Sequence, residues 1–191
     1  MRALLLVDLQ NDFCKNGALE VPHGDGAVEN SNLLIPKFDI VVATQDWHPR
    51  GHMSFASNNE GAELFSTVDG QVMWPDHCIQ GSKGAELHPY LLTDDICAVV
   101  RKGMDPKYDS YSGFFDDDKK STGLDGLLRD LGADVLHICG LATDVCVKAT
   151  VLDALELMYE VHLHVDACRG VTMEGHIKAV EEMEENGVTI E

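Results

Sequence analysis

Basic side chains are scarce in this sequence. Fourteen lysines and arginines stand against 33 aspartates and glutamates, which gives a formal net charge of −19 at pH 7. A chain with this excess of negative charge repels the phosphates of nucleic acids and the anionic surfaces of membranes. We therefore expect neither nucleic acid nor a membrane as a partner, and a neutral or cationic small molecule is the easier substrate to accommodate.

Closely spaced cysteines and long apolar runs are also absent. The six cysteines contain no CxxC pair, which disfavours a disulfide framework and favours reduced thiols in the cytoplasm. The first apolar run ends at Asp8 with no cleavage site after it, and no later run is long enough to cross a bilayer. A length of 191 residues with 45% hydrophobic side chains predicts one domain spanning residues 1–191.

Short apolar runs alternate with segments of helical spacing. The apolar runs predict buried strands over residues 3–7, 40–43, 96–100, 135–139 and 161–165. Helical spacing predicts helices over residues 123–131, 145–158 and 174–185, and a short helix over 29–37 that Pro36 limits to about two turns. This alternation predicts an α/β fold with a mostly parallel central sheet, flanked by helices on both faces.

Polar residues follow the predicted strands. In parallel sheets the carboxyl ends of the strands meet at one edge, where binding sites form. We expect this edge to collect a carboxylate, a metal site, a cation and a thiol. The residues at the strand ends are Asp8 after the first strand, Asp46 and His48 after the second, Arg101 and Lys102 after the third, and Cys146 beyond the turn that follows the fourth.

Cys146 lies where the fourth predicted strand turns into a helix. The unpaired N–H groups and the positive dipole end at a helix start make a thiol ionise more easily and offer donors to a developing oxyanion. Cys146 is therefore the candidate nucleophile. The alternative is a small buried cysteine that only fills space at a strand-to-helix corner.

Asp46 and His48 stand two residues apart, so an extended chain points both side chains to the same side. His52 and His77 lie in the long irregular stretch 49–95 and would complete a site. Imidazoles with one carboxylate suit zinc, iron or manganese. The alternative is that these histidines are loop residues satisfied by hydrogen bonds.

Asp8 and Lys102 each allow an ordinary and a functional interpretation. Asp8 is either a turn carboxylate that accepts backbone N–H groups or a general base that takes the thiol proton and returns it to the leaving group. Lys102 is either a solvated charge or a cation that favours both anionic neighbours. Neither residue decides the matter alone.

Six motifs in order carry a resemblance to a known family: VDLQNDF, TQDWHPRGHMSFAS, WPDHCIQ, RKG, YDSYSGFFD and GLATDVCV. They closely resemble the nicotinamidases of the isochorismatase-like cysteine hydrolases, of the bacterial type that also accepts pyrazinamide. The resemblance extends from Arg2 to about Gly170. It implies the isochorismatase-like fold and, as the reaction, hydrolysis of nicotinamide to nicotinate and ammonia through a cysteine thioester in NAD salvage.

The resemblance also implies a role for each matching residue. The catalytic residues would be Asp8, Lys102 and Cys146. The backbone N–H groups of Ala142 and Cys146 would form an oxyanion hole beside a cis bond between Leu141 and Ala142. The side chains that line the pyridine pocket would be Phe13, Trp74 and Tyr111.

The family resemblance also implies a bound divalent metal. Its ligands would be Asp46, His48 and His77, while His52 matches a histidine that binds metal in only some members. Zinc is the expected ion, with iron and manganese as the other candidates, and in the family the ion can hold the pyridine nitrogen of the substrate.

The resemblance leaves open whether the chain forms a homo-oligomer. Two rival interpretations of the function also stay open at this point. A sister enzyme of the same fold would be an isochorismatase or an amidase acting on N-carbamoyl compounds, but these generally lack the metal set of Asp46, His48 and His77. A non-catalytic module that senses metal or redox state would bind metal and expose reactive thiols without turnover.

Overall fold

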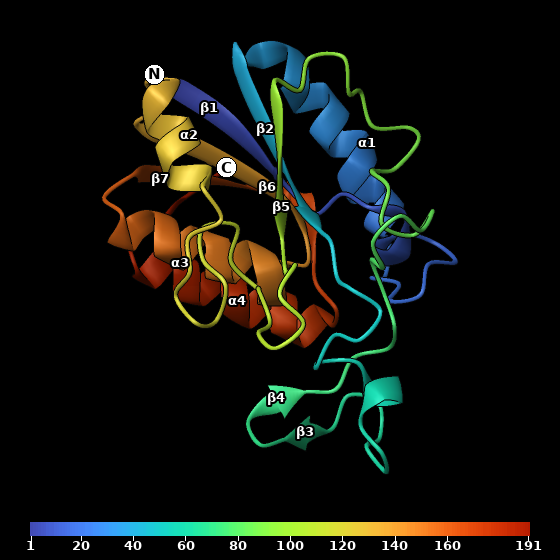
Figure 1. Cartoon of the computed structure of the whole chain (residues 1–191). Helices are drawn as coiled ribbons and strands as arrows, with labels where there is room; N and C mark the ends of the chain where they lie inside the picture. The colour runs from blue at the N-terminus through green and yellow to red at the C-terminus, as the bar shows by residue number, and fades with distance from the viewer.

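The computed structural model describes residues 1–191, and at its centre is a six-stranded sheet in which every strand pairing is parallel (Figure 1). The strand order is β5-β2-β1-β6-β7-β8. The strands are β1 (Arg2–Val7), β2 (Ile40–Asp46), β5 (Ala98–Lys102), β6 (Val135–Leu141), β7 (Glu160–Arg169) and β8 (Thr189–Ile190).

Helices cover both faces of this sheet. On one face α1 (Gly24–Leu34) packs against β6 and β7. On the other lie α3 (Lys148–Glu156), which contacts β7, and α4 (Met173–Glu185), which contacts α3; α2 (Leu124–Asp130) stands above them in the view of Figure 1. The predicted α/β architecture is therefore confirmed. No helix is both long and apolar enough to span a bilayer.

The central strands are buried on both faces, as their apolar sequences require. In β1 every residue from Ala3 to Val7 is fully buried, and in β2 every residue is buried. By contrast β5, the edge strand, alternates between half-buried and exposed residues up to Arg101 and ends on the buried Lys102. The buried central strands fix the positions of the residues that follow them, because a shift in register would move apolar side chains out of the core.

The first helix and the third strand lie at other positions than the sequence predicted. The first helix begins at Gly24, not near Glu29, and has 11 residues before a 3-10 turn at Ile35–Lys37. Gly24 and Gly26 are poor helix formers, so they hide its first turn in the sequence. The third predicted strand, 96–100, is displaced by two residues to Ala98–Lys102.

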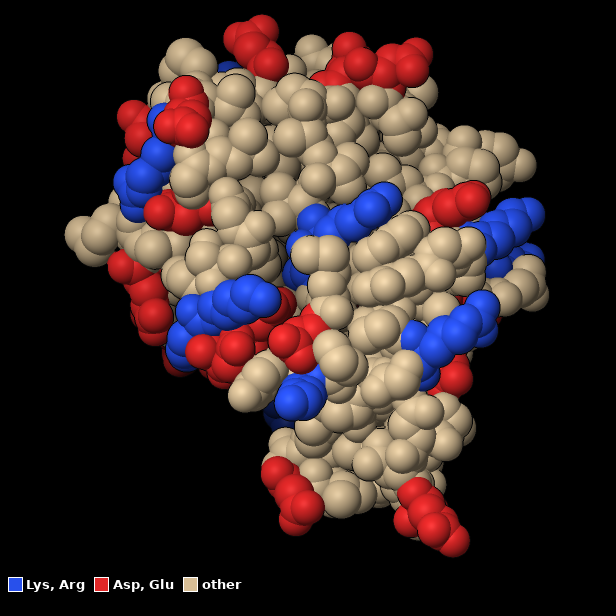
Figure 2. All heavy atoms as spheres, in the orientation of Figure 1, with Lys and Arg blue, Asp and Glu red and all other residues tan.

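The chain between His48 and His77 forms a small lobe that stands away from the sheet (Figure 1). Its two-stranded hairpin, β3 (Thr67–Val68) with β4 (Gln71–Val72), turns through Asp69 and Gly70, both with positive φ. An Asp-Gly pair is a strong signal for such a turn, yet the stretch 49–95 was predicted to be irregular throughout. Figure 2 shows acidic side chains at the outer end of the lobe, and the basic side chains on this face are separated from one another.

Gly140 provides a test of how closely β6 packs against β1. Its φ is +131°, and an added Cβ would lie 2.1 Å from the Val7 carbonyl oxygen. We predict that Gly140→Ala lowers the free energy of unfolding by at least about 2 kcal/mol. Gly126→Ala is the matched control, because a Cβ there meets nothing within 4 Å and alanine favours helix by up to about 1 kcal/mol. Urea unfolding of both variants measures the difference, and equal stabilities would contradict it.

Candidate active site

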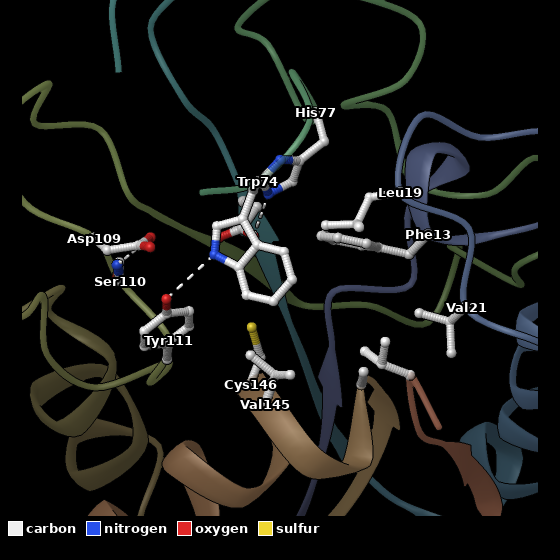
Figure 3. A pocket seen from close by; sticks show the side chains of 13 residues that line it. Phe13, Leu19, Val21, Trp74, His77, Asp109, Ser110, Tyr111, Val145 and Cys146 are labelled. Carbon is white, nitrogen blue, oxygen red and sulfur yellow. Dashed lines mark hydrogen bonds and ion pairs between the residues drawn. The ribbon is translucent and has the colours of Figure 1, made fainter. Parts of the chain in front are cut away.

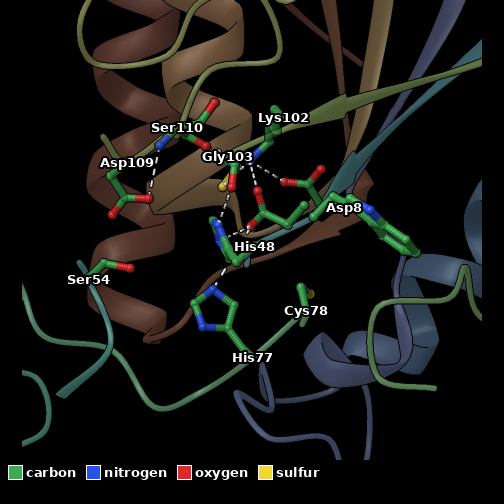
Figure 4. Close-up of polar contacts among 12 residues, drawn as sticks. Asp8, His48, Ser54, His77, Cys78, Lys102, Gly103, Asp109 and Ser110 are labelled. Atoms are coloured by element: carbon green, nitrogen blue, oxygen red, sulfur yellow. Dashed lines mark hydrogen bonds and ion pairs between the residues drawn. The ribbon is translucent and has the colours of Figure 1, made fainter. Parts of the chain in front are cut away.

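Three side chains from remote parts of the chain meet at the carboxyl edge of the sheet. Asp8 follows β1, Lys102 ends β5, and Cys146 lies in the turn after β6. Lys102 Nζ is 3.0 Å from Asp8 Oδ2 and 3.5 Å from Cys146 Sγ, and all three residues are buried (Figure 4). The structure thus brings together the thiol, acid and amine that the sequence predicted.

Both carboxylate oxygens of Asp8 are engaged. Oδ1 accepts a hydrogen bond from Thr44 Oγ1 at 2.6 Å. Oδ2 is buried and forms an ion pair with Lys102 Nζ at 3.0 Å. One donor atom each from Asp8, Asp46 and Cys146 lie within 4.8 Å of one another. A carboxylate this close to a thiol is placed to accept its proton.

Burial controls the protonation of this group. It raises the pKa of the Cys146 thiol well above its usual value, although the Lys102 charge lowers it. This corrects the prediction that the thiol ionises easily, because desolvation outweighs the favourable Lys102 charge. Burial also raises the pKa of Asp8 against the opposing Lys102 charge. The thiol is therefore neutral at rest and needs a base, and Asp8 is a stronger base than an exposed carboxylate.

Lys102 keeps its charge despite complete burial. Burial alone would lower its pKa, but the carboxylates of Asp46 and Asp8 raise it well above the usual value. Its Nζ lies 2.5 Å from Asp46 Oδ1. The ammonium therefore acts as a fixed cation between two carboxylates and the thiol.

Asp46, His48 and His77 form a group that fits a divalent ion. His48 Nε2 is 3.6 Å and His77 Nε2 is 4.0 Å from Asp46 Oδ2, and all three residues are buried. Each Nδ1 is held by a backbone carbonyl, that of Gly103 for His48 and that of Pro75 for His77. This second contact fixes the ring so that Nε2 faces the other donors, which is the usual arrangement around a metal.

His52 is placed differently from the other two histidines. Its Nδ1 lies 2.7 Å from Ser54 Oγ and its Nε2 3.0 Å from the Tyr108 carbonyl oxygen, so both nitrogens are engaged. The ring packs on His48 with a centroid distance of 4.2 Å. His52 therefore supports His48 in this structure and is not oriented as a ligand.

A pocket with largely apolar walls opens over Cys146. Phe13 and Trp74 stand on two sides of the thiol in Figure 3, and Tyr111 accepts a hydrogen bond at its hydroxyl from Trp74 Nε1 at 3.2 Å. Asp46 and His77 reach the same cavity. The wall also includes Val145 of the Cys146 turn and three residues outside the helices and strands, Leu19, Val21 and Val171, which sequence reasoning missed because isolated apolar residues in loops give no pattern.

The turn before Cys146 has the backbone that the resemblance implied. The Leu141–Ala142 peptide bond is cis. Residues Thr143–Val147 form a single π-helical turn that passes into α3, so the helix predicted over 145–158 is regular only from Lys148. Both Ala142 and Cys146 line the pocket.

Two supporting residues went unnoticed in the sequence. Gln10 binds both backbone groups of Asp46, donating to its carbonyl at 2.9 Å and accepting from its N–H at 2.8 Å. Gln71, in the lobe, donates to the Asp109 carboxylate at 2.7 Å. Arg101, which was grouped with Lys102 at the strand end, instead lies over the Trp47 ring at 3.9 Å and takes no part in the site.

Comparison with known proteins gives consistent matches over the whole chain. The model of the isochorismatase domain matches residues 2–191. The nicotinamidase of Escherichia coli is 53% identical over 91% of this chain and 85% of its own. A nicotinamidase/pyrazinamidase structure from Acinetobacter baumanii covers 99% of this chain and 94% of its own, at 41% identity and a TM-score of 0.94. The zinc complex of the Pyrococcus horikoshii pyrazinamidase covers 100% and 98%, at 38% identity and a TM-score of 0.85.

Removing the Lys102 charge tests the electrostatics of the site. Lys102→Met leaves two buried carboxylates without their cation, so we predict a loss of about 3–5 kcal/mol in the free energy of unfolding. Alkylation of Cys146 by iodoacetamide at pH 8, followed by peptide mass spectrometry, should slow at least about tenfold, equivalent to one pKa unit. Arg101→Met, which removes an exposed charge beside it, is the control. Unchanged alkylation of Cys146 in Lys102→Met would show that Lys102 does not stabilise the thiolate.

Proposed function

Because the chain belongs to the isochorismatase family, we propose that it hydrolyses nicotinamide to nicotinate and ammonia through a thioester on Cys146. The observation that carries the proposal is the convergence of Asp8, Lys102 and Cys146 beside a buried set of three metal donors. The identity to the Escherichia coli nicotinamidase supports the substrate. Pyrazinamide, which has a similar flat ring and carboxamide, is the second expected substrate.

The pocket suits a small neutral aromatic amide. The rings of Phe13 and Trp74 offer flat apolar surfaces on which a pyridine ring can stack, and they keep bulk water away from the thiol. An ion held by Asp46, His48 and His77 would supply a Lewis-acid contact for the ring nitrogen. The carboxamide carbon would then lie over Cys146 Sγ.

The residues of the site divide the reaction between them. Asp8 takes the Cys146 proton and becomes a neutral carboxylic acid, and the thiolate attacks the amide carbon while the Lys102 ammonium stabilises the negative charge on sulfur. The tetrahedral oxyanion receives hydrogen bonds from the N–H groups of Ala142 and Cys146, each worth about 3 kcal/mol. The C–N bond breaks as Asp8 returns the proton to leaving ammonia. Asp8 then deprotonates a water, which cleaves the thioester to nicotinate and restores the thiol.

Zinc is the proposed ion because two imidazoles and one carboxylate leave a coordination position open for the substrate. The zinc complex of the Pyrococcus horikoshii pyrazinamidase supports this choice. Iron and manganese accept the same donors. We place the reaction in the cytoplasm as part of NAD salvage, in keeping with six cysteines that are all free thiols.

Replacing the nucleophile tests the proposal directly. Cys146→Ala should release ammonia from nicotinamide at least about 10³-fold more slowly than the unchanged enzyme. Cys97→Ala removes an exposed thiol and should leave the rate unchanged. A coupled ammonia assay with nicotinamide, pyrazinamide, an N-carbamoyl amine and isochorismate separates the proposed activity from the sister enzymes. Turnover of none of them would favour the sensor interpretation.

Metal removal tests the role of the donor set. In the Cys146→Ala background, which does not consume the substrate, exhaustive dialysis against a chelator should weaken nicotinamide binding measured by calorimetry at least about tenfold, because the ring loses its contact with the ion. Readdition of Zn²⁺, Fe²⁺ or Mn²⁺ one at a time should restore binding and identify the ions that work. His77→Ala should behave like the chelated protein, and full binding in that variant would remove the metal from the proposal.

A further inference from the structure

Three histidines and a glutamate form a cluster that the proposed hydrolysis does not use. His162 and His164 are two residues apart in β7, and His137 is the register partner of His162 in β6. The Glu191 carboxylate lies against them, with Oε1 2.7 Å from His162 Nδ1 and Oε2 3.9 Å from His164 Nδ1. We call these four residues the histidine cluster.

The histidine cluster is separate from the candidate active site. Cys139, two residues after His137 in β6, contacts Ser31 of α1, so the alternation of a strand places His137 on the α1 face of the sheet as well. Phe38, beyond the end of α1, packs on the His137 ring with centroids 4.7 Å apart. Cys146, by contrast, follows the carboxyl end of β6.

The donor atoms of the cluster are almost close enough to share an ion. One atom each from His137, His162 and Glu191 lie within 4.8 Å of one another, and His137 Nδ1 is 2.9 Å from His164 Nε2. Ligands of a tetrahedral zinc ion, with Zn–N bonds of about 2.0 Å, lie about 3.3 Å apart. Shifts of about 1 Å would therefore bring these donors to coordination distance.

Hydrogen bonding within the protein does not account for the whole cluster. His137 is 4% exposed, and its Nε2 is buried without a hydrogen-bond partner. Nearly all buried polar groups in proteins are paired, and a bound ion accounts for some of the exceptions.

The charges around the cluster are mixed. Glu191 and Glu160, whose Oε1 is 3.0 Å from His162 Nε2, attract a cation. Arg2 and Lys37 repel a cation here. Their positive charges act on the cluster, since Arg2 lowers the pKa of His137 and Lys37 lowers that of His164. The formal charge of −19 on the whole chain adds a general attraction for cations.

We propose that the histidine cluster is a second metal site, which binds Zn²⁺ through His137, His162 and Glu191, while His164 holds the His137 ring through its Nδ1. Two imidazoles on one face of a rigid sheet with one carboxylate are a donor set that zinc prefers to calcium or magnesium. The site is remote from Cys146, so the ion has a structural function. It fastens the chain after β8 to β6 and β7.

Zinc stoichiometry tests the proposal on tag-free full-length protein. After metal removal, saturation with Zn²⁺ and gel filtration, elemental analysis should find two zinc ions per chain in the unchanged protein. The double variant His162→Asn/His164→Asn should hold one and keep its nicotinamide hydrolysis. His23→Asn, the same change at an exposed histidine, should hold two. One ion in the unchanged protein, or two in the double variant, would overturn the second site.

A variant that lacks the metal donors of the candidate active site tests the second metal site independently of the proposed function. His48→Ala/His77→Ala removes donors of the candidate active site, so it should retain one zinc ion per chain, and Zn²⁺ should raise its melting temperature by several degrees. Adding His162→Asn to that background should abolish both effects. Failure of the nicotinamidase proposal would leave these results unchanged, whereas no zinc in His48→Ala/His77→Ala would overturn the second site alone.

Discussion

The ion pair between Lys102 and Asp46 joins the two halves of the candidate active site. The two residues are register partners at the ends of the neighbouring strands β5 and β2, so the sheet itself sets their separation. Asp46 gives Oδ1 to Lys102 and presents Oδ2 to His48 and His77. One carboxylate thus contacts both the ammonium beside the Cys146 thiol and the two imidazoles of the candidate metal site. Neither half can shift without disturbing the other, because an unpaired charge at this depth costs several kcal/mol.

Burial gives this site both its reactivity and its selectivity. Desolvation raises the pKa values of Asp8 and Cys146 together, so the proton rests on the thiol until a substrate fills the pocket. The same apolar walls that cause the desolvation fit a flat ring and exclude larger polar molecules. A more open site would ionise the thiol earlier but would also expose it to oxidants and water.

The sequence predicted the parallel sheet and the meeting of Asp8, Lys102 and Cys146 because both follow from strong local patterns. Continuous apolar runs mark buried strands, and strand ends place their next residues at one edge. What it could not predict depends on contacts between distant segments. The glycines of α1 concealed its first turn, and the strand pattern alone did not separate Arg101 from Lys102, which the family resemblance singled out and the structure places inward. Gln10 gave no signal because its partners lie on β2 and in the loop near Ala85.

The protruding lobe is held at its neck. His48 and His77 stand on either side of it in the chain, and isolated backbone bridges join His48 to Ile79 and Phe55 to Trp74 across the same place. These bridges at the neck set the distance between the two imidazoles. The chain between them forms a loop whose ends are held together. The entropic cost of bringing the ends of a loop together changes only slowly with the length of the loop. The tip of the hairpin at Asp69 and Gly70 can therefore gain or lose residues at little cost while the donor geometry stays constant.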